Sequence, residues 1–364
     1  MNDSTARIFR IFERFQNYFE AISQFKLQLS FSRVGFENSN DVWKWNQFLQ
    51  EISYVPVGWN ETSIRYQKAY LCSNGAKTEV FKFIVSNSKN LMAIFTVSIE
   101  INKLDLVISY KLRNISPPLM KETSTIEDRK LIYYSWLSAL EKLSHEIEID
   151  GVLLEISIDK EIFLEVVRVI NLEKLFEYVG KKEYYCINLV DSEKNIYENV
   201  RKSYKSLINQ QIKKYEYKIL CSDNYEQKSW EDFRLLHLRV SGRITRSEET
   251  WNLQGKMIKE GNAFLVSAFH EDKIIGGTFI ILSKNDAYYG VGAYIRGVKE
   301  LICSHSLQYL AINEAKRIGI TKYILGDACL ENDYFKYSEK EKNIAHFKKG
   351  FTISTITTEA FLLH

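Results

Sequence analysis

Several features that mark other classes of protein are missing from this sequence. Its five cysteines are scattered, no C-x-x-C pair occurs, and no His/Cys group has the spacing of zinc ligands. The sequence therefore predicts neither a disulfide-bonded secreted domain nor a metal site, and it favours a reducing compartment. The cysteines are Cys72, Cys186, Cys221, Cys303 and Cys329.

The chain also lacks a large charge excess and a long apolar run. Its formal net charge of +3 over 364 residues is too small for bulk binding of nucleic acid or membranes, so any basic function must be local. The most apolar stretch, AFLVSAFHEDKIIGGTFIIL, is divided by the charged turn at residues 270–273 into two strand-sized pieces. Charges are mixed through the first thirty residues, so no secretory signal is expected. We expect a cytoplasmic protein that meets any membrane-linked substrate peripherally, at the inner face of the membrane.

The residues that are present indicate two α+β domains. A length of 364 residues, with 45% hydrophobic and 26% charged residues, is typical of two globular cores of similar size. In the first half we expect a Phe-rich amphipathic helix over residues 5–25, a short helix at VWKWNQFLQEI, and three strand-like runs, the last ending at Pro117. A helix with Thr125 and Asp128 as capping residues follows, then strand, helix and strand.

The second half repeats this order of elements. We expect one long helix over residues 192–215, a strand, two helices on either side of Gly242, and three antiparallel strands joined by tight turns at HEDK and SKND. A helix ending at Gly319, a strand, a short helix and a final strand complete the pattern. The predicted domains are residues 1–190 and 191–364, each with a mostly antiparallel sheet flanked by helices. The final strand is able to pack with the first domain.

Motifs in the second half resemble one family. AYYGVGAYIRG, the helix ending AKRIGI, the strand closing on Gly326 and Asp327, and FKKGF resemble the second domain of the FemABX family of tandem GNAT-type acyltransferases. VRKSYKSLINQQIKKYEYKI and SGRITRSEETW fit the same resemblance, the latter to a subgroup among envelope-polysaccharide enzymes. The resemblance is specific over residues 196–352 and rests mainly on layout before them. It implies two GNAT-like domains that transfer aminoacyl or acyl groups to cell-wall precursors or surface sugars.

A glycine-rich turn that GNAT enzymes use is reduced here. Ordinary members hold the CoA pyrophosphate in such a turn, whose backbone N–H groups point at the phosphates. The corresponding segment, YIRGVKELICSHS, has the single glycine Gly297. FemABX-like enzymes share this loss and use a charged tRNA. The resemblance therefore leaves aminoacyl-tRNA and acyl-CoA open as the donor co-substrate, with no permanently bound cofactor and with tRNA as a potential partner.

The basic helix is a first candidate for substrate binding. Arg201, Lys205 and Lys213 recur at multiples of four residues and share one face, and Tyr204 lies on the apolar side. Such a run of charge is commonly no more than a solvated face. In the family, the matching helix contacts the diphosphate and nucleotide of the acceptor. This implies that Arg201 and Lys205 contact phosphate and that Tyr204 stacks on the ligand.

The stretch HLRVSGRITRSEETW is a second candidate for substrate binding. Arg239, Arg243 and Arg246 crowd the break between two helices, the second of which starts at Thr245 or Ser247, and Thr245 with Glu248 fits a capping box for it. A helix N-terminus beside arginines favours phosphate or carboxylate. The alternative is a set of surface ion pairs, which would contribute little. Its acidic partners would be Glu231, Glu248 and Glu249.

The segment HFKKGF is the candidate reacting centre. Its lysines and Gly350 also fit an ordinary helix end. In FemABX-like enzymes the Phe-Lys pair lies at the reacting centre. This implies that Lys348 stabilises negative charge on the acyl carbonyl or a phosphate, with Phe347 packed against it. Asp327 ends a strand that diverges from its neighbour in GNAT folds, and it is either a proton acceptor for the attacking amine or a turn residue.

Three further residues complete the predicted site. His305 opens the helix after the single-glycine turn, where it is either a donor contact or, more commonly, structural. Tyr289 and Tyr294 lie on the central strand, where side chains on the cleft face can orient substrate and the others enter the core.

These observations give one leading function and two alternatives. The leading hypothesis is a FemABX-like N-acyl- or aminoacyltransferase that forms an amide on an amine of a nucleotide-sugar, a lipid-linked sugar or a peptidoglycan precursor. The break between the two helices that carries Arg239, Arg243 and Arg246, which we call the arginine bend, would hold the diphosphate of this acceptor together with the basic helix. The first alternative is an acyl-CoA-dependent acyltransferase of an amino sugar for O-antigen or capsule. The second is a non-catalytic double-GNAT module that binds a glycan precursor or a partner enzyme.

Overall fold

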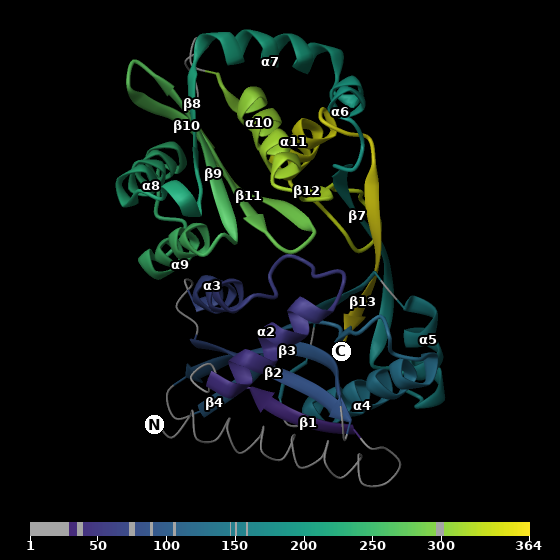
Figure 1. Cartoon of the computed structure of the whole chain (residues 1–364). Helices are drawn as coiled ribbons and strands as arrows, with labels where there is room; N and C mark the ends of the chain where they lie inside the picture. Colours follow the sequence, from purple (N-terminus) through teal and green to yellow (C-terminus); the bar gives the residue numbers. More distant parts are fainter. Residues whose placement is uncertain are drawn as a thin grey trace. The chain divides into compact units, whose positions relative to one another are not determined.

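A computed structural model of the chain is shown in Figure 1. The chain falls into two units, the first containing Met1–Ser53, Asn74–Lys181 and Thr358–His364, and the second containing Tyr54–Ser73 and Lys182–Thr357. Compared with the ranges 1–190 and 191–364 expected from the sequence, residues 54–73 and 182–190 fall in the second unit and residues 358–364 in the first. The structure describes residues 29–34, 39–72, 77–87, 90–104, 107–145, 147–149, 151–157, 159–295 and 302–364.

The first unit is built on an antiparallel sheet with the order β1-β2-β3-β4, in which β5 also pairs with β3. α4 begins with the predicted capping box of Thr125 and Asp128 and places Trp136 in the core. β6 pairs antiparallel with the end of β13, which adds Phe361 to the same core. The elements are β1 (Leu29–Val34), α2 (Ser39–Glu51), β2 (Lys77–Asn87), β3 (Leu91–Leu104), β4 (Val107–Ile115), β5 (Leu119–Met120), α4 (Ile126–Ser144), β6 (Val152–Ile156) and α5 (Lys160–Val169), while β7 (Phe176–Asn188) and β13 (Thr355–Leu363) run through both units.

The second unit is built on a sheet with the order β7-β12-β11-β10-β9-β8. Neighbouring strands are antiparallel except β11 and β12, which are parallel. The predicted meander of β9, β10 and β11 is confirmed, and Glu271 and Asp272 take φ angles of 50° and 60° in its first turn, as a two-residue hairpin requires. The elements are α3 (Glu61–Cys72), α6 (Glu193–Asn199), α7 (Lys202–Lys214), β8 (Glu216–Leu220), the 3₁₀ turn η1 (Ser222–Asn224), α8 (Gln227–Ser241), α9 (Glu248–Lys259), β9 (Ala263–His270), β10 (Lys273–Leu282), β11 (Asp286–Tyr294), α10 (Ser304–Arg317), β12 (Lys322–Asp327) and α11 (Glu339–Lys349).

Helices cover both faces of this second sheet (Figure 1). α7 and α10 pack on one face, and α8 and α9 pack on the other. Two consecutive glycines in β10 allow side chains on both faces of the sheet to come close to its backbone. A Cβ on Gly276 would come within 2.4 Å of Cys303 Sγ, and a Cβ on Gly277 within 2.5 Å of the Phe233 ring. The expected α+β architecture with mostly antiparallel sheets is therefore confirmed.

The parallel pairing of β11 and β12 is short. It joins only Asp286 to Lys322, Ala287 to Tyr323, and Tyr288 to Ile324. Beyond these residues β11 continues beside β10, while Gly326 and Asp327 of β12 pair with β7 across a register shift. The two strands therefore diverge at their C-terminal ends, as the sequence analysis expected for the region around Asp327.

Two local predictions were wrong. The long helix over residues 192–215 is divided into α6 and α7, because Val200 is extended and buried and the Arg201 N–H donates to the Gly350 carbonyl oxygen at 2.8 Å. The N-cap of α9 is Ser247 rather than Thr245, and Ser247 Oγ accepts from the Thr250 N–H. The break before α9 falls at Gly242 as predicted, with φ of 67°.

Two predicted features lie outside the described residues. They are the helix over residues 5–25 and most of the single-glycine turn, residues 296–301. Within the part of the chain that the structure describes, none of the helices combines the length and apolar character needed to cross a bilayer.

A buried carboxyl group lies where β11 begins. Asp286 is fully buried, its Oδ2 accepts from the Tyr54 hydroxyl at 2.6 Å, and Lys322 Nζ is 3.8 Å from its Oδ1. Oδ1 has no hydrogen-bond partner among the described residues. Burial raises the pKa of Asp286, and this effect outweighs the opposing effects of Tyr54 and Lys322.

We expect Asp286 to make the fold less stable as the pH rises. Its pKa is higher in the fold than the value of about 3.9 in the unfolded chain. The corresponding stability is fully present below the unfolded pKa and is lost as pH rises through the folded pKa. Between about pH 4 and pH 7, Asp286→Asn should therefore gain stability relative to the parent chain, as measured by urea denaturation. A stability difference that does not change with pH would contradict this assignment.

Candidate functional site

Lys348 lies at the point where β11 and β12 diverge. α11 begins with a capping box of Ser338 and Glu341, and its last turn carries Lys348. A Cβ on Gly326 would come within 2.7 Å of Lys348 Nζ. Gly326 has φ of 106° and lies two positions after Ile324, the last residue of β12 that pairs with β11. The glycine therefore leaves room for the ammonium group at the opening between the strands.

The surroundings of Lys348 are partly desolvated. Burial lowers the pKa of Lys348, and nearby Asp327 opposes the shift. An ammonium group in such a site interacts more strongly with a negative charge that forms beside it than an exposed one would. Burial also raises the pKa of the neighbouring Cys329 thiol to about 11, so this thiol is protonated at neutral pH.

Asp327 is held by three partners. Its Oδ1 accepts from the Cys329 N–H at 2.7 Å, and its Oδ2 lies 3.4 Å from both Tyr337 Oη and Lys182 Nζ. These contacts fit the turn residue considered in the sequence analysis, and they fix a negative charge near Lys348. A role as proton acceptor stays a prediction.

Phe347, Tyr204 and His305 come together in one aromatic cluster with Phe351. Ring centroids are 4.3 Å apart for Tyr204 and His305, and 5.3 Å apart for His305 and Phe347. Tyr204 lies directly against Gly350, where a Cβ would overlap its ring. Burial lowers the pKa of His305 to about 4, so this ring is neutral. The cluster packs α7, α10 and α11 beside Lys348.

The two basic residues predicted with Tyr204 have other partners. Arg201 lies over the Tyr204 ring at 5.1 Å and its Nη1 is 3.0 Å from His346 Nε2. Lys205 Nζ donates to the Glu198 carbonyl oxygen at 3.0 Å. Both therefore help to hold the start of α7, and phosphate binding by them stays a prediction.

Tyr289 and Tyr294 share one face of β11 because of a bulge. The register shifts so that Phe279 faces Val291 and Ile280 faces Tyr289, which leaves Gly290 as the extra residue. The two hydroxyl oxygens are 2.9 Å apart, and that of Tyr294 is 2.8 Å from Thr278 Oγ1. A Cβ on Gly292 would overlap both hydroxyls. The pair thus fills space beside the strand and orders this face.

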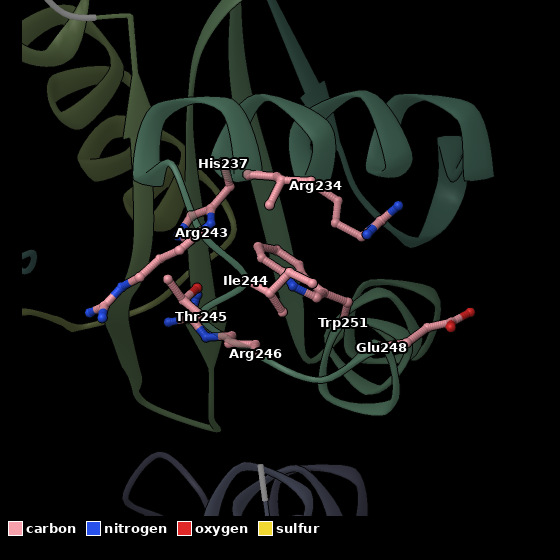
Figure 2. Close-up of a pocket in the computed structure, with 9 residues that line it drawn as sticks. Arg234, His237, Arg243, Ile244, Thr245, Arg246, Glu248 and Trp251 are labelled. Carbon is pink, nitrogen blue, oxygen red and sulfur yellow. The ribbon is translucent and has the colours of Figure 1, made fainter. Parts of the chain in front are cut away.

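The arginine bend forms a pocket of about 210 Å³ between α8 and α9. Figure 2 shows Arg243 and Arg234 on opposite sides, with the Trp251 ring between them. Arg239 is exposed on α8 and does not line the pocket. The lining residues are Arg234, His237, Leu238, Arg243, Ile244, Thr245, Arg246, Glu248 and Trp251.

Arg246 is the most constrained of these arginines. Its guanidinium carbon lies 5.5 Å from the Trp251 ring and 5.9 Å from the Tyr70 ring of α3. Nε and Nη1 are buried without a hydrogen-bond partner among the described residues. Burial lowers the pKa of His237 to about 4, and Arg246 adds to the shift. Unsatisfied buried donors are costly, and an anion entering the pocket would satisfy them.

Surface ion pairs do not account for the arginine bend. The Glu231 carboxylate is paired with Arg234. Within the described chain, Arg239, Arg243 and Arg246 form no ion pair with any carboxylate. The anion-binding hypothesis therefore applies best to Arg246 and Arg243, and not to Arg239.

Some residues of these sites were not predicted. Tyr66 and Tyr70, four residues apart on α3, flank Arg246, and Arg246 lowers the Tyr66 pKa against the larger effect of burial. They come from the first half of the sequence, so no local pattern connects them with Arg246. Lys182 was also missed. Its position directly before the strand segment EYYCINLV gave no signal of a contact with Asp327.

The fold belongs to a recognisable class. Two mostly antiparallel sheets with flanking helices, the second with one parallel strand pair that diverges, are the features of a tandem GNAT-type fold. FemX is similar over 91% of this chain and 96% of that chain, with a TM-score of 0.63 and 12% identity. The tandem GNAT protein from the clavulanic acid biosynthesis pathway is similar over 92% and 97%, with a TM-score of 0.51 and 10% identity.

A third solved structure has the same architecture. L-PGS from Bacillus licheniformis is similar over 90% of this chain and 92% of that chain, with a TM-score of 0.52 and 12% identity. No family model and no curated protein sequence matches the chain. The structural likenesses establish a FemABX/GNAT-type fold, as the sequence resemblance implied.

We expect both buried histidines to stay neutral well below neutral pH. Imidazole NMR titration should give midpoints near 4 for His237 and His305. Because the Arg246 charge contributes only at His237, Arg246→Gln should raise the midpoint of His237 and leave that of His305 unchanged. Equal shifts of both midpoints would indicate a general change in the fold instead.

Proposed function

We propose that the protein is an amide-forming acyltransferase of the FemABX type, acting on the cytoplasmic side of the cell envelope. One observation carries this proposal: the ammonium group of Lys348 lies at the opening between β11 and β12, against Gly326. A positive charge at that position suits the carbonyl oxygen of a donor placed between the strands. The FemABX/GNAT-type fold and the motifs over residues 196–352 support the same reaction class.

The proposed reaction needs no covalent enzyme intermediate. A primary amine of the acceptor attacks the activated carbonyl carbon of the donor, and Lys348 stabilises the oxyanion that forms. The new C–N bond replaces a C–S bond of acyl-CoA or a C–O bond of aminoacyl-tRNA. The leaving thiolate or alkoxide takes the bonding electrons and gains a proton. The amine loses its proton to water or to Asp327, whose carboxylate lies nearby.

The arginine pocket is the proposed site for a phosphate of the acceptor. Its volume suits a phosphate or diphosphate group better than a whole nucleotide-sugar. Arg246 supplies unsatisfied donors and Arg243 adds a second charge at the rim. A nucleotide- or lipid-linked sugar that carries an amine would present such a group. The proposal covers both the nucleotide-linked and the lipid-linked acceptor.

The donor is either acyl-CoA or aminoacyl-tRNA. The similar structures include a tandem GNAT protein without AcCoA and the C-terminal domain of a putative lysylphosphatidylglycerol synthetase from Agrobacterium fabrum. A thermal-shift screen with CoA, acetyl-CoA, UDP-sugars and aminoacyl-tRNA analogues would separate the two donor classes, because a specific ligand raises the melting temperature. A shift with CoA species would identify the acyl-CoA reaction.

Replacing Lys348 should abolish catalysis without unfolding the protein. With the donor and acceptor from that screen, Lys348→Met should lower kcat by about 10²- to 10³-fold, the usual effect of removing one oxyanion-stabilising group. The matched control is Lys349→Met, which removes an adjacent but exposed lysine and should change kcat by less than about twofold. Equal rates for the two variants would exclude Lys348 from the reaction.

Replacing Arg246 should weaken acceptor binding. Calorimetric titration with pyrophosphate should show about a tenfold or greater loss for Arg246→Gln, because a charge-assisted hydrogen bond is typically worth ~1.5–3 kcal/mol. Arg239→Gln is the control, since Arg239 lies outside the pocket. Unchanged pyrophosphate affinity in Arg246→Gln would remove the acceptor phosphate from this site.

A further inference from the structure

The bend between α8 and α9 carries exposed apolar side chains. Leu235, Leu238 and Ile244 are 45%, 37% and 81% exposed. They lie on the last two turns of α8 and on the loop that follows its C-cap, Gly242. A soluble surface tolerates single exposed apolar residues, but three on one short segment indicate a surface that contacts something apolar.

The same segment is positively charged. From Leu235 to Ser247 the sequence has three arginines and no Asp or Glu. Arg239 and Arg243 are exposed, and in the described part of the chain neither forms an ion pair. The carboxylates on the preceding turns form ion pairs with other residues, Glu231 with Arg234 and Asp232 with Lys228. The arginines are therefore available to an external anionic surface.

Another exposed isoleucine provides a comparison for the bend. Ile353 is 79% exposed, almost as much as Ile244. No charged residue occurs from Gly350 to Thr358 on either side of it. Exposure of an isoleucine alone is therefore not unusual in this protein. What distinguishes Ile244 from Ile353 is that exposed arginines without an ion pair in the described chain lie beside it.

We propose that the α8–α9 bend docks on the surface of an anionic lipid bilayer, with Ile244 entering the interface and Arg239 and Arg243 contacting lipid phosphates. Apolar side chains that enter the headgroup region, surrounded by basic residues, are the combination that binds peripheral proteins to anionic membranes. Arg239, which does not line the pocket, has a role under this proposal that a soluble ligand in the pocket would not give it.

This docking also selects between the two acceptor classes, and in this respect it rests on the proposed function. Leu238 and Ile244 line the arginine pocket and are exposed at its rim. A phosphate held in the pocket would therefore have apolar side chains beside its exit. A lipid-linked acceptor matches that arrangement, since its phosphate joins a polar group to a hydrocarbon chain. A water-soluble nucleotide-linked acceptor leaves the apolar rim unused.

The test is co-sedimentation of the full chain with vesicles. Vesicles of phosphatidylcholine with about 30% phosphatidylglycerol should pellet the protein, and vesicles of phosphatidylcholine alone should pellet much less. Ile244→Ser should weaken partitioning about tenfold, whereas the matched control Ile353→Ser should not change it. Arg239→Gln with Arg243→Gln should weaken partitioning by about fivefold per arginine, and 0.5 M NaCl should do the same because it screens surface charge.

Each outcome decides the proposal. Failure to pellet with either vesicle, or equal partitioning of Ile244→Ser and Ile353→Ser, would overturn docking through the bend. If replacing the arginines weakens vesicle binding but replacing Ile244 does not, the attraction is electrostatic without entry of Ile244 into the interface, and this would also overturn the proposal. Pyrophosphate titration of the parent chain and of Arg246→Gln separates the two proposals. If pyrophosphate binds through Arg246 while vesicles do not bind, the acceptor site stands and the docking surface falls. If vesicles bind while pyrophosphate does not, the reverse holds.

Discussion

The short parallel pairing of β11 and β12 is the constraint on which the second unit depends. Three residue pairs hold the strands together, and after Tyr288 and Ile324 each strand pairs only with its other neighbour. This divergence interrupts the ladder in the middle of the sheet. Gly326 keeps the opening free of a side chain, and α11 places an ammonium group against it. The bulge at Gly290 then turns Tyr289 and Tyr294 to one face, where their hydroxyls bond to each other.

A second constraint is the cost of burying charge. The two basic sites meet it in different ways. Lys348 is close to a carboxylate that is itself fixed by Lys182, Tyr337 and a backbone N–H. Arg246 has no carboxylate, and aromatic rings take the place of a counter-ion while two of its nitrogen atoms have no hydrogen-bond partner in the described chain. The first arrangement supplies a counter-charge, and the second leaves two donors that the proposed anion would satisfy. The unsatisfied donors of Arg246 therefore support the proposal of an anion in the arginine pocket.

The sequence was sufficient for the fold class and for most elements of the second unit, because periodicity, turn residues and motifs agree there. It failed where a tertiary contact decides the local structure. The helix break at Val200 depends on the Gly350 carbonyl oxygen, about 150 residues away in the chain. Of the predicted site residues, Phe347, His305 and Tyr204 form one ring cluster, Lys348 lies against Gly326, and Arg243 and Arg246 line one pocket, while their roles stay predictions. Tyr66, Tyr70 and Lys182 could not be predicted, because nothing in the residues around them points to partners so distant in sequence.

The exchange of segments between the units has a consequence for how the chain is made. Tyr54–Ser73 belongs to the second unit, and Thr358–His364 to the first. As the polypeptide emerges from the ribosome, the first unit lacks a core strand until residues 358–364 have been made, since Phe361 and Leu363 are part of that core. The second unit includes helix α3, which is made well before the rest of that unit. Cutting the gene between Lys181 and Lys182 would therefore separate each half from a segment that its unit contains.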